Sequence, residues 1–322
     1  DTTMRGSLRD PIRPTAHGVE YSSFHDRNSP DSSKMCGACH DIVTPKGVHL
    51  ERTFAEYDES IFGKPGPGFE TCQGCHMPGR DGVAADYEGV PSRRVHSHMW
   101  PGVDVALTDF PGRAAQRREI EACELPTSIQ FFDVEITGPA EPEFAIQIWL
   151  ETAAGHNQPS GASQDRRMWV EVTAFDADDR AYFKSGHIAD DQLEAPTEND
   201  PAPLLMHDRL LNEAGEEVHM FWEAAEVDRE THPTLPAAKS LVPGTHSLGY
   251  PYLLRRQPER LLVRVRIRPM SLGVLRDLVD SGHLDQSIVD AMPTFTVYEA
   301  EMTYDAAARR FVVTRKSRPE CE

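Results

Sequence analysis

The chain has 322 residues and a formal net charge of −19, so it is long enough for two domains, and its charge argues against nucleic acid as a partner. Hydrophobic residues make up 39% of it, and no apolar run approaches the roughly 18 residues that a membrane-spanning helix needs. The 25 prolines and 22 glycines predict many turns and little long helix. The acidic surface favours solubility, and it would also attract basic partners.

Two five-residue strings in the first third of the chain carry the strongest signal. Residues 36–40 read CGACH and residues 72–76 read CQGCH, and each is the C-x-x-C-H attachment signature of c-type haem. In such a string the two thiols form thioethers with the haem vinyl groups, and the histidine binds the iron. The sequence therefore predicts two covalent haem c groups per chain, with these residues as attachment and proximal ligands: Cys36, Cys39, His40, Cys72, Cys75 and His76.

A four-cysteine zinc site is the alternative, because paired C-x-x-C knuckles also bind zinc. About 32 residues separate the two pairs, which is more than a compact zinc ribbon uses. Histidine is a rare residue here, at 14 of 322, so a chance histidine after both pairs would be unusual. The haem interpretation is therefore preferred.

Residues 1–118 are expected to form a haem-binding domain that is irregular and mostly helix and loop. This region is rich in Gly, Pro, Ser and charged residues and has little periodicity. Short helices are expected after each attachment string, and residues 53–60 are one candidate, with Phe54 and Tyr57 on one face.

Residues 119–322 are expected to form a second domain, an antiparallel β-sandwich of immunoglobulin-like type. Apolar and polar residues alternate over 144–150, 168–174 and 263–268, and turn-forming residues separate these segments. Helical spacing of apolar residues over about 271–292 predicts a short helical insertion before the last strands, which would include Phe295, Val297 and residues 311–313.

A low-spin haem iron needs a second axial ligand, and the chain has 14 histidines from which to supply it. His96 and His98 follow the second string closely, and His156 lies in a loop of glycine and proline, AGHNQPSG, between two predicted strands. An ordinary turn or a solvent-exposed side chain is the alternative for each. Met77 and Met99 could serve as thioether ligands instead. The histidines of the β region are expected to be surface or packing residues, namely His187, His207, His219, His232, His246 and His283.

Cys123 and Cys321 remain outside the strings, and they could pair or stay free. Haem c is attached outside the cytoplasm, so an extracytoplasmic location, periplasmic or at the cell surface, is expected and a disulfide is permitted there.

The segments 33–41, 53–60 and 71–78 together resemble bacterial multihaem cytochromes c related to the tetrahaem cytochromes of nitrifiers and to hydroxylamine-oxidoreductase-like proteins. The resemblance extends to 98–102 and to the loop 154–161, and it covers about residues 5–300. It implies bis-histidine haems in electron-transfer chains, with His17, His98 and His156 matching recurring family histidines. Relatives often carry further attachment strings upstream of a segment like residues 5–11, and this sequence has none.

These observations predict an electron-transfer cytochrome that passes single electrons between its haems and a redox partner or a larger assembly such as a filament. The alternative is a haem-dependent reductase or oxidoreductase of small nitrogen or sulfur oxyanions. That activity would need an open iron position, and Arg93 and Arg94 near His96 are conceivable distal cations for it. The electron-transfer interpretation, in which the protein is not an enzyme, is preferred because candidate axial histidines outnumber the haems.

Overall fold

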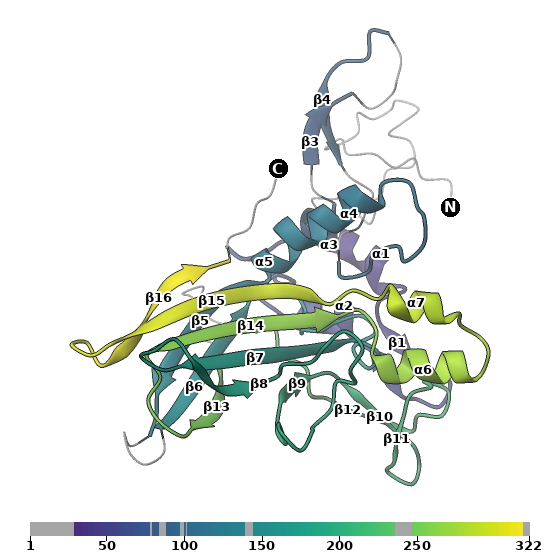
Figure 1. Ribbon diagram of the computed structural model, residues 1–322. Coiled ribbons are helices and arrows are strands. Elements are labelled where there is room, and N and C mark those ends of the chain that lie inside the picture. The colour runs from purple at the N-terminus through teal and green to yellow at the C-terminus, as the bar shows by residue number, and fades with distance from the viewer. Residues whose placement is uncertain are drawn as a thin grey trace.

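The computed structural model describes residues 29–77, 79–83, 88–96, 100, 102–138, 144–235 and 247–317. Over these residues the chain is mainly β, with several antiparallel sheets and few helices (Figure 1). No helix in the described part is both long and apolar enough to cross a membrane.

The first part of the described chain alternates short helices with two small hairpins. Its elements are η2 (Pro30–Ser32), α1 (Ser33–Gly37), β1 (Ile42–Val43), β2 (His49–Glu51), α2 (Thr53–Glu59), α3 (Cys72–His76), β3 (Gly79–Gly82) and β4 (Arg93–His96). Strand β1 pairs with β2, and β3 pairs with β4, both antiparallel. Three short helical elements follow: α4 (Arg113–Glu119), the π-helical turn η3 (Ile120–Glu124) and α5 (Leu125–Thr127).

The expected fold class, a mostly helical and irregular haem domain followed by an immunoglobulin-like sandwich, is wrong. The helices of the first part span seven residues or fewer, and hairpins lie between them. Short helices gain too few hydrogen bonds to offset the cost of nucleation, so they form here only where packing supports them. The later part also has more than two sheets, because β10 (Arg209–Leu211), β11 (Glu217–Val218) and β12 (Glu226–Asp228) form a separate small sheet.

The later part of the chain supplies the longer strands. They are β5 (Ile129–Ile136), β6 (Phe144–Thr152), β7 (Arg167–Phe175), β8 (Ala181–Ser185), β9 (Leu204–Met206), β10 (Arg209–Leu211), β11 (Glu217–Val218), β12 (Glu226–Asp228), β13 (Leu248–Leu254), β14 (Arg260–Arg268), β15 (Phe295–Asp305) and β16 (Arg310–Lys316). One sheet has the order β13-β6-β5, and the larger has the order β16-β15-β14-β7-β8 with β9 beside β7.

Alternation along these strands separates a buried face from a polar one. In β6, Phe144, Ile146, Ile148 and Leu150 are each at most 1% exposed, because every second side chain of a strand points to the same face. On the opposite face of β14, Arg264 bonds across the sheet to Glu171 of β7, at 2.8 Å, and to Glu299 of β15, at 2.6 Å.

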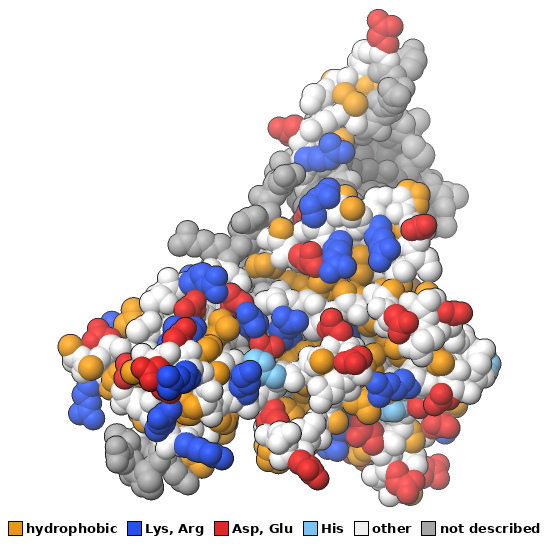
Figure 2. Space-filling model, in the orientation of Figure 1, with side chains coloured by type: hydrophobic (Ala, Val, Ile, Leu, Met, Phe, Trp, Pro, Cys, Tyr) orange, Lys and Arg blue, Asp and Glu red, His pale blue; other side chains and the backbone are white. Residues whose placement is uncertain are grey.

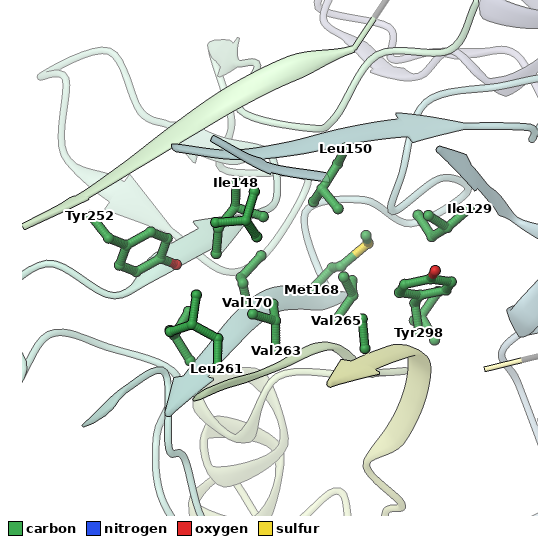
Figure 3. Close-up of a cluster of buried hydrophobic side chains, with 14 of the residues drawn as sticks. Ile129, Ile148, Leu150, Met168, Val170, Tyr252, Leu261, Val263, Val265 and Tyr298 are labelled. Carbon is green, nitrogen blue, oxygen red and sulfur yellow. The ribbon is translucent and has the colours of Figure 1, made fainter. Parts of the chain in front are cut away.

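The main hydrophobic core lies between the two large sheets. Ile148 and Tyr252 from the smaller sheet face Val170, Leu261 and Val263 from the larger one (Figure 3). Fully burying an aliphatic side chain stabilises the fold by roughly 1.5–3 kcal/mol, so this core accounts for much of the stability of the β region.

Two helices lie between β14 and β15, where the helical spacing predicted them. They are α6 (Leu272–Asp280) and α7 (Gln286–Asp290). The side chain of Ser271 caps the first and that of Asp285 caps the second, each by accepting a backbone N–H bond. Leu272, Leu275 and Val289 form a small core between them.

The helices α3, α4 and α5 lie along one edge of the packed sheets, and the hairpin β3–β4 projects away from them (Figure 1). The face shown in Figure 2 carries side chains of both signs of charge over most of its area. Helix α4 has the sequence RAAQRRE, so it contributes three arginines to a chain that is acidic as a whole.

Candidate functional site

Each attachment string forms a short helical turn that keeps its two cysteines and its histidine together. The first string begins in α1, and backbone bonds from Cys39 and His40 to the Cys36 carbonyl, at 3.0 and 2.9 Å, continue the turn. The second string is α3 itself, and the Thr71 side chain caps it by accepting the Gly74 N–H at 3.0 Å. The thiols and the histidine of each string are thus held on a single turn.

A buried polar network joins the two strings. Gln73 donates to the Ser32 carbonyl at 2.9 Å, and the Cys72 N–H donates to the Ser33 hydroxyl at 3.1 Å. Tyr57 of α2 accepts from that hydroxyl at 3.1 Å, and its own O–H donates to the Glu70 carbonyl at 3.1 Å. Because buried polar groups are costly unless they are paired, this network favours one arrangement of the strings.

The first cysteines of the two strings are neighbours. The Cys36 thiol is hydrogen-bonded to the Cys72 sulfur, which lowers the pKa of Cys72 to about 6 and raises that of Cys36. We call this contact the Cys36–Cys72 junction. Haems attached to these sulfurs would therefore have neighbouring attachment points.

Both proximal histidines have a carboxylate at Nδ1. The Nδ1 atom of His40 lies 2.9 Å from Oε1 of Glu51, and the Nδ1 atom of His76 lies 3.4 Å from Oε1 of Glu124. The Glu51 hydrogen bond raises the pKa of His40. A proton on Nδ1 places the coordinating lone pair on Nε2, so each imidazole is in the form that binds iron.

The ring of His156 lies close to that of His76. The two ring centroids are 6.2 Å apart and the ring planes differ by 15°. Imidazole–metal bonds are about 2 Å long, so two rings that share one iron need a separation of this order. Burial lowers the pKa of His156 to about 4 and keeps the imidazole neutral, which is the ligating state. These residues fit a haem iron.

Two other segments hold the loop that carries His156. Glu56 of α2 accepts from the backbone N–H and the side-chain amide of Asn157, both at 3.1 Å. The Asn157 side chain in turn accepts the Thr234 N–H at 2.9 Å. The His156 Nδ1 lies 3.0 Å from the Asn157 carbonyl, so the anchored residue also orients the ring.

Some of the remaining candidate ligands lie within the described residues, and others lie outside them. His96 is on β4, and its Nδ1 lies 2.9 Å from the Met77 carbonyl. His49 accepts a hydrogen bond from Arg52 at Nδ1, which puts its proton on Nε2 and makes it a poor iron ligand. His17, His98 and Met99 lie outside the described residues, as do the side chains of Arg93 and Arg94.

The β-region histidines differ in their burial and in their partners. His207 and His232 are buried at 8% and 2% exposure, and His219 pairs with Asp277. His246 lies outside the described residues.

In the described chain no group of three or more His, Cys, Asp or Glu side chains could hold a metal ion, so the four string cysteines are not gathered as a zinc site requires. Cys123 is disulfide-bonded, and Cys321 lies outside the described residues.

Sequence reasoning missed Glu51, Glu124 and the Glu56–Asn157 pair. None of them belongs to a motif, and each reaches its partner only through tertiary structure, over separations of 11, 48 and 101 residues for Glu51–His40, Glu124–His76 and Glu56–Asn157. One weak signal was available, because carboxylates often lie behind metal-bound histidines.

No protein-family model and no curated protein matches the sequence. Among solved structures, the chain is similar to the crystal structure of a penta-heme cytochrome c552 from Thermochromatium tepidum, with 19% sequence identity and a TM-score of 0.53. The match covers 84% of this chain and 55% of the cytochrome, so this chain spans little more than half the length of that protein. Kinship with the nitrifier and hydroxylamine-oxidoreductase-like proteins stays a prediction. The chain thus shares a fold with part of a multihaem cytochrome c.

Proposed function

We propose that this protein is an electron-transfer cytochrome that carries two covalent haem c groups. Cys36 and Cys39 would attach one haem and Cys72 and Cys75 the other, with His40 and His76 as proximal iron ligands. Bound haem supplies an iron centre that takes up and gives up single electrons. The observation that carries the proposal is the pairing of the strings, because the bonds of Gln73 to the Ser32 carbonyl and of the Cys72 N–H to the Ser33 hydroxyl bring the two attachment sites together.

His156 is proposed as the second axial ligand at the second string. The 6.2 Å separation of its ring from that of His76 and the neutral state of its half-buried imidazole support this role. The second ligand at the first string is proposed from His17, His96 and His98. Iron with two histidine ligands has no open position for substrate, which favours electron transfer over reduction of a bound oxyanion.

The division of labour within the chain is also proposed. Residues 1–118 would carry both haems, and residues 119–322 would supply His156, shield the second haem and offer a docking surface. The partners would be other cytochromes or redox proteins, alone or in a multihaem assembly, in an extracytoplasmic compartment where haem c is attached. The fold shared with part of a penta-heme cytochrome supports this setting.

The test begins with intact mass after denaturation, which should exceed the polypeptide mass by two haems. Replacing Cys72 and Cys75 together by Ser should remove one haem mass and leave the other, with the parent protein as control. Visible and magnetic-resonance spectra should show six-coordinate, low-spin iron at both sites, and the reduced protein should pass electrons to an oxidised small cytochrome c. Zinc without haem, or high-spin iron that binds nitrite or hydroxylamine, would contradict the proposal.

A further inference from the structure

Each proximal histidine has its own carboxylate, and each carboxylate comes from an element outside the attachment string. Glu51 ends β2 and pairs across the hairpin with Ile42, two residues after His40. Glu124 ends the π-helical turn η3, far along the chain from His76. Both sites thus place a carboxylate beside the histidine, but the carboxylate comes from a hairpin strand in one case and from a helical turn in the other.

Both carboxylates are held in place, and both are largely screened from water. The Glu51 side chain is 12% exposed, and the Thr53 hydroxyl donates to its Oε1 at 3.2 Å. The Glu124 side chain is 23% exposed and lies on a turn whose first residue, Ile120, is fully buried in the main core. Electrostatic effects are stronger where water is excluded, so either carboxylate can act on its imidazole.

A carboxylate that accepts the Nδ1 proton makes an imidazole a stronger donor to a metal, and it also fixes the tautomer and the ring orientation. A stronger donor stabilises the oxidised iron relative to the reduced iron. The reduction potential of that iron then falls.

Resting on the proposed function, we propose that Glu51 and Glu124 are positioning residues that lower the reduction potentials of the two haems separately. Glu51 acts on the first haem through His40, and Glu124 acts on the second through His76. The Glu51 contact is the shorter, at 2.9 Å against 3.4 Å, so the two sites are tuned to different degrees.

The test uses the complete two-haem protein and single Gln substitutions, which keep the size of the side chain and remove its charge. Glu51→Gln should raise one of the two midpoint potentials in a redox titration, and Glu124→Gln should raise the other. The controls are Glu59→Gln, at an exposed position of α2, and Glu121→Gln, on the same turn as Glu124 and paired with Arg117. Each control removes one negative charge without removing an imidazole partner.

Midpoints that move no further than in the controls, or two variants that shift the same midpoint, would overturn the inference. Haem mass and low-spin spectra are recorded on every sample, because a missing haem in the parent protein contradicts the proposed function instead. If Glu124→Gln does not assemble, the reduced parent protein provides the second measurement. The Nδ1 proton of His76 should exchange slowly with solvent in proton NMR, and fast exchange would exclude the role of Glu124.

Discussion

The two attachment strings have the same C-x-x-C-H pattern, yet they lie in different surroundings. His40 is 60% exposed, and its carboxylate comes from the adjacent hairpin β1–β2. His76 is 30% exposed and lies between two residues of the later part of the chain, Glu124 and His156. Each string is thus local to five residues, whereas the surroundings of His76, unlike those of His40, come from segments that are distant in sequence.

The comparison also suggests different roles for the two sites. In the proposed arrangement the second site takes a ligand and its shielding from the β region, so its properties should follow the integrity of that region. The first site depends on its own hairpin and should be less sensitive to changes in the sheets.

The largest effect is expected from His156→Ala. Covalent haem content should stay at two, because both strings are intact, while the second haem alone should become high-spin or water-ligated and shift in potential. Magnetic-resonance and visible spectra of the oxidised protein report the change. His283→Ala, at an exposed position in the helical insertion, is the control. Spectra and potentials identical to those of the parent would remove His156 from the ligand set.

Glu194→Ala should destabilise the β region without touching either string. Arg268 is fully buried and is paired with Glu194, which is 1% exposed on its side chain. Leaving one partner of a buried ion pair uncompensated costs about 3–5 kcal/mol. Denaturant unfolding followed by tryptophan fluorescence measures the loss, and Glu198→Ala, at an exposed site, should stay within about 0.5 kcal/mol of the parent. The low-spin signal of the second haem should be lost at lower denaturant than that of the first.

Asn157→Ala should loosen the anchor of the His156 loop. It removes the amide bond to Glu56 and the acceptor of the Thr234 N–H, and burial already raises the pKa of the Glu56 carboxyl. A hydrogen bond to a charged group contributes roughly 1.5–3 kcal/mol, so a loss of about 2–3 kcal/mol is expected. The second haem should show a broadened low-spin signal and the first an unchanged one. Gln286→Ala, which removes an exposed amide, should change neither stability nor spectra.

The smallest effect concerns pH and the β region alone. Burial, reinforced by Arg167 and Arg209, lowers the pKa of His207 to about 3, and its Nδ1 is buried without a hydrogen-bond partner. The unfolded chain therefore binds a proton here first, and stability is lost as pH falls from about 6.5 towards 3. Between pH 7 and pH 5 this histidine should cost about 2 kcal/mol, at roughly 1.4 kcal/mol per unit of pKa.

The variant His207→Gln should have a free energy of unfolding that falls by about 2 kcal/mol less than that of the parent over this range. Equilibrium denaturation at the two pH values measures the difference, whatever the substitution does to stability at pH 7. Equal pH dependence in the two proteins would show that His207 does not titrate differently on folding.

The sequence by itself determined the features that depend on neighbouring residues. The C-x-x-C-H pattern of residues 36–40 and 72–76 predicts haem attachment there, because one helical turn suffices to hold two thiols and a histidine. Period-two alternation located β6, β7 and β14, and helical spacing located α6 and α7, because in each case one face must be buried.

Only the tertiary structure decided the rest. The prediction that the first part is mostly helical and irregular was wrong, because short segments rich in Gly and Pro take their conformation from the segments that they pack against. The contacts of Glu51 and Glu124 with the proximal histidines, and the facing of His76 by His156, join residues that no local pattern relates. Side chains this far apart along the chain meet only when whole sheets and helices pack together, and packing depends on the summed burial of many residues rather than on any one motif.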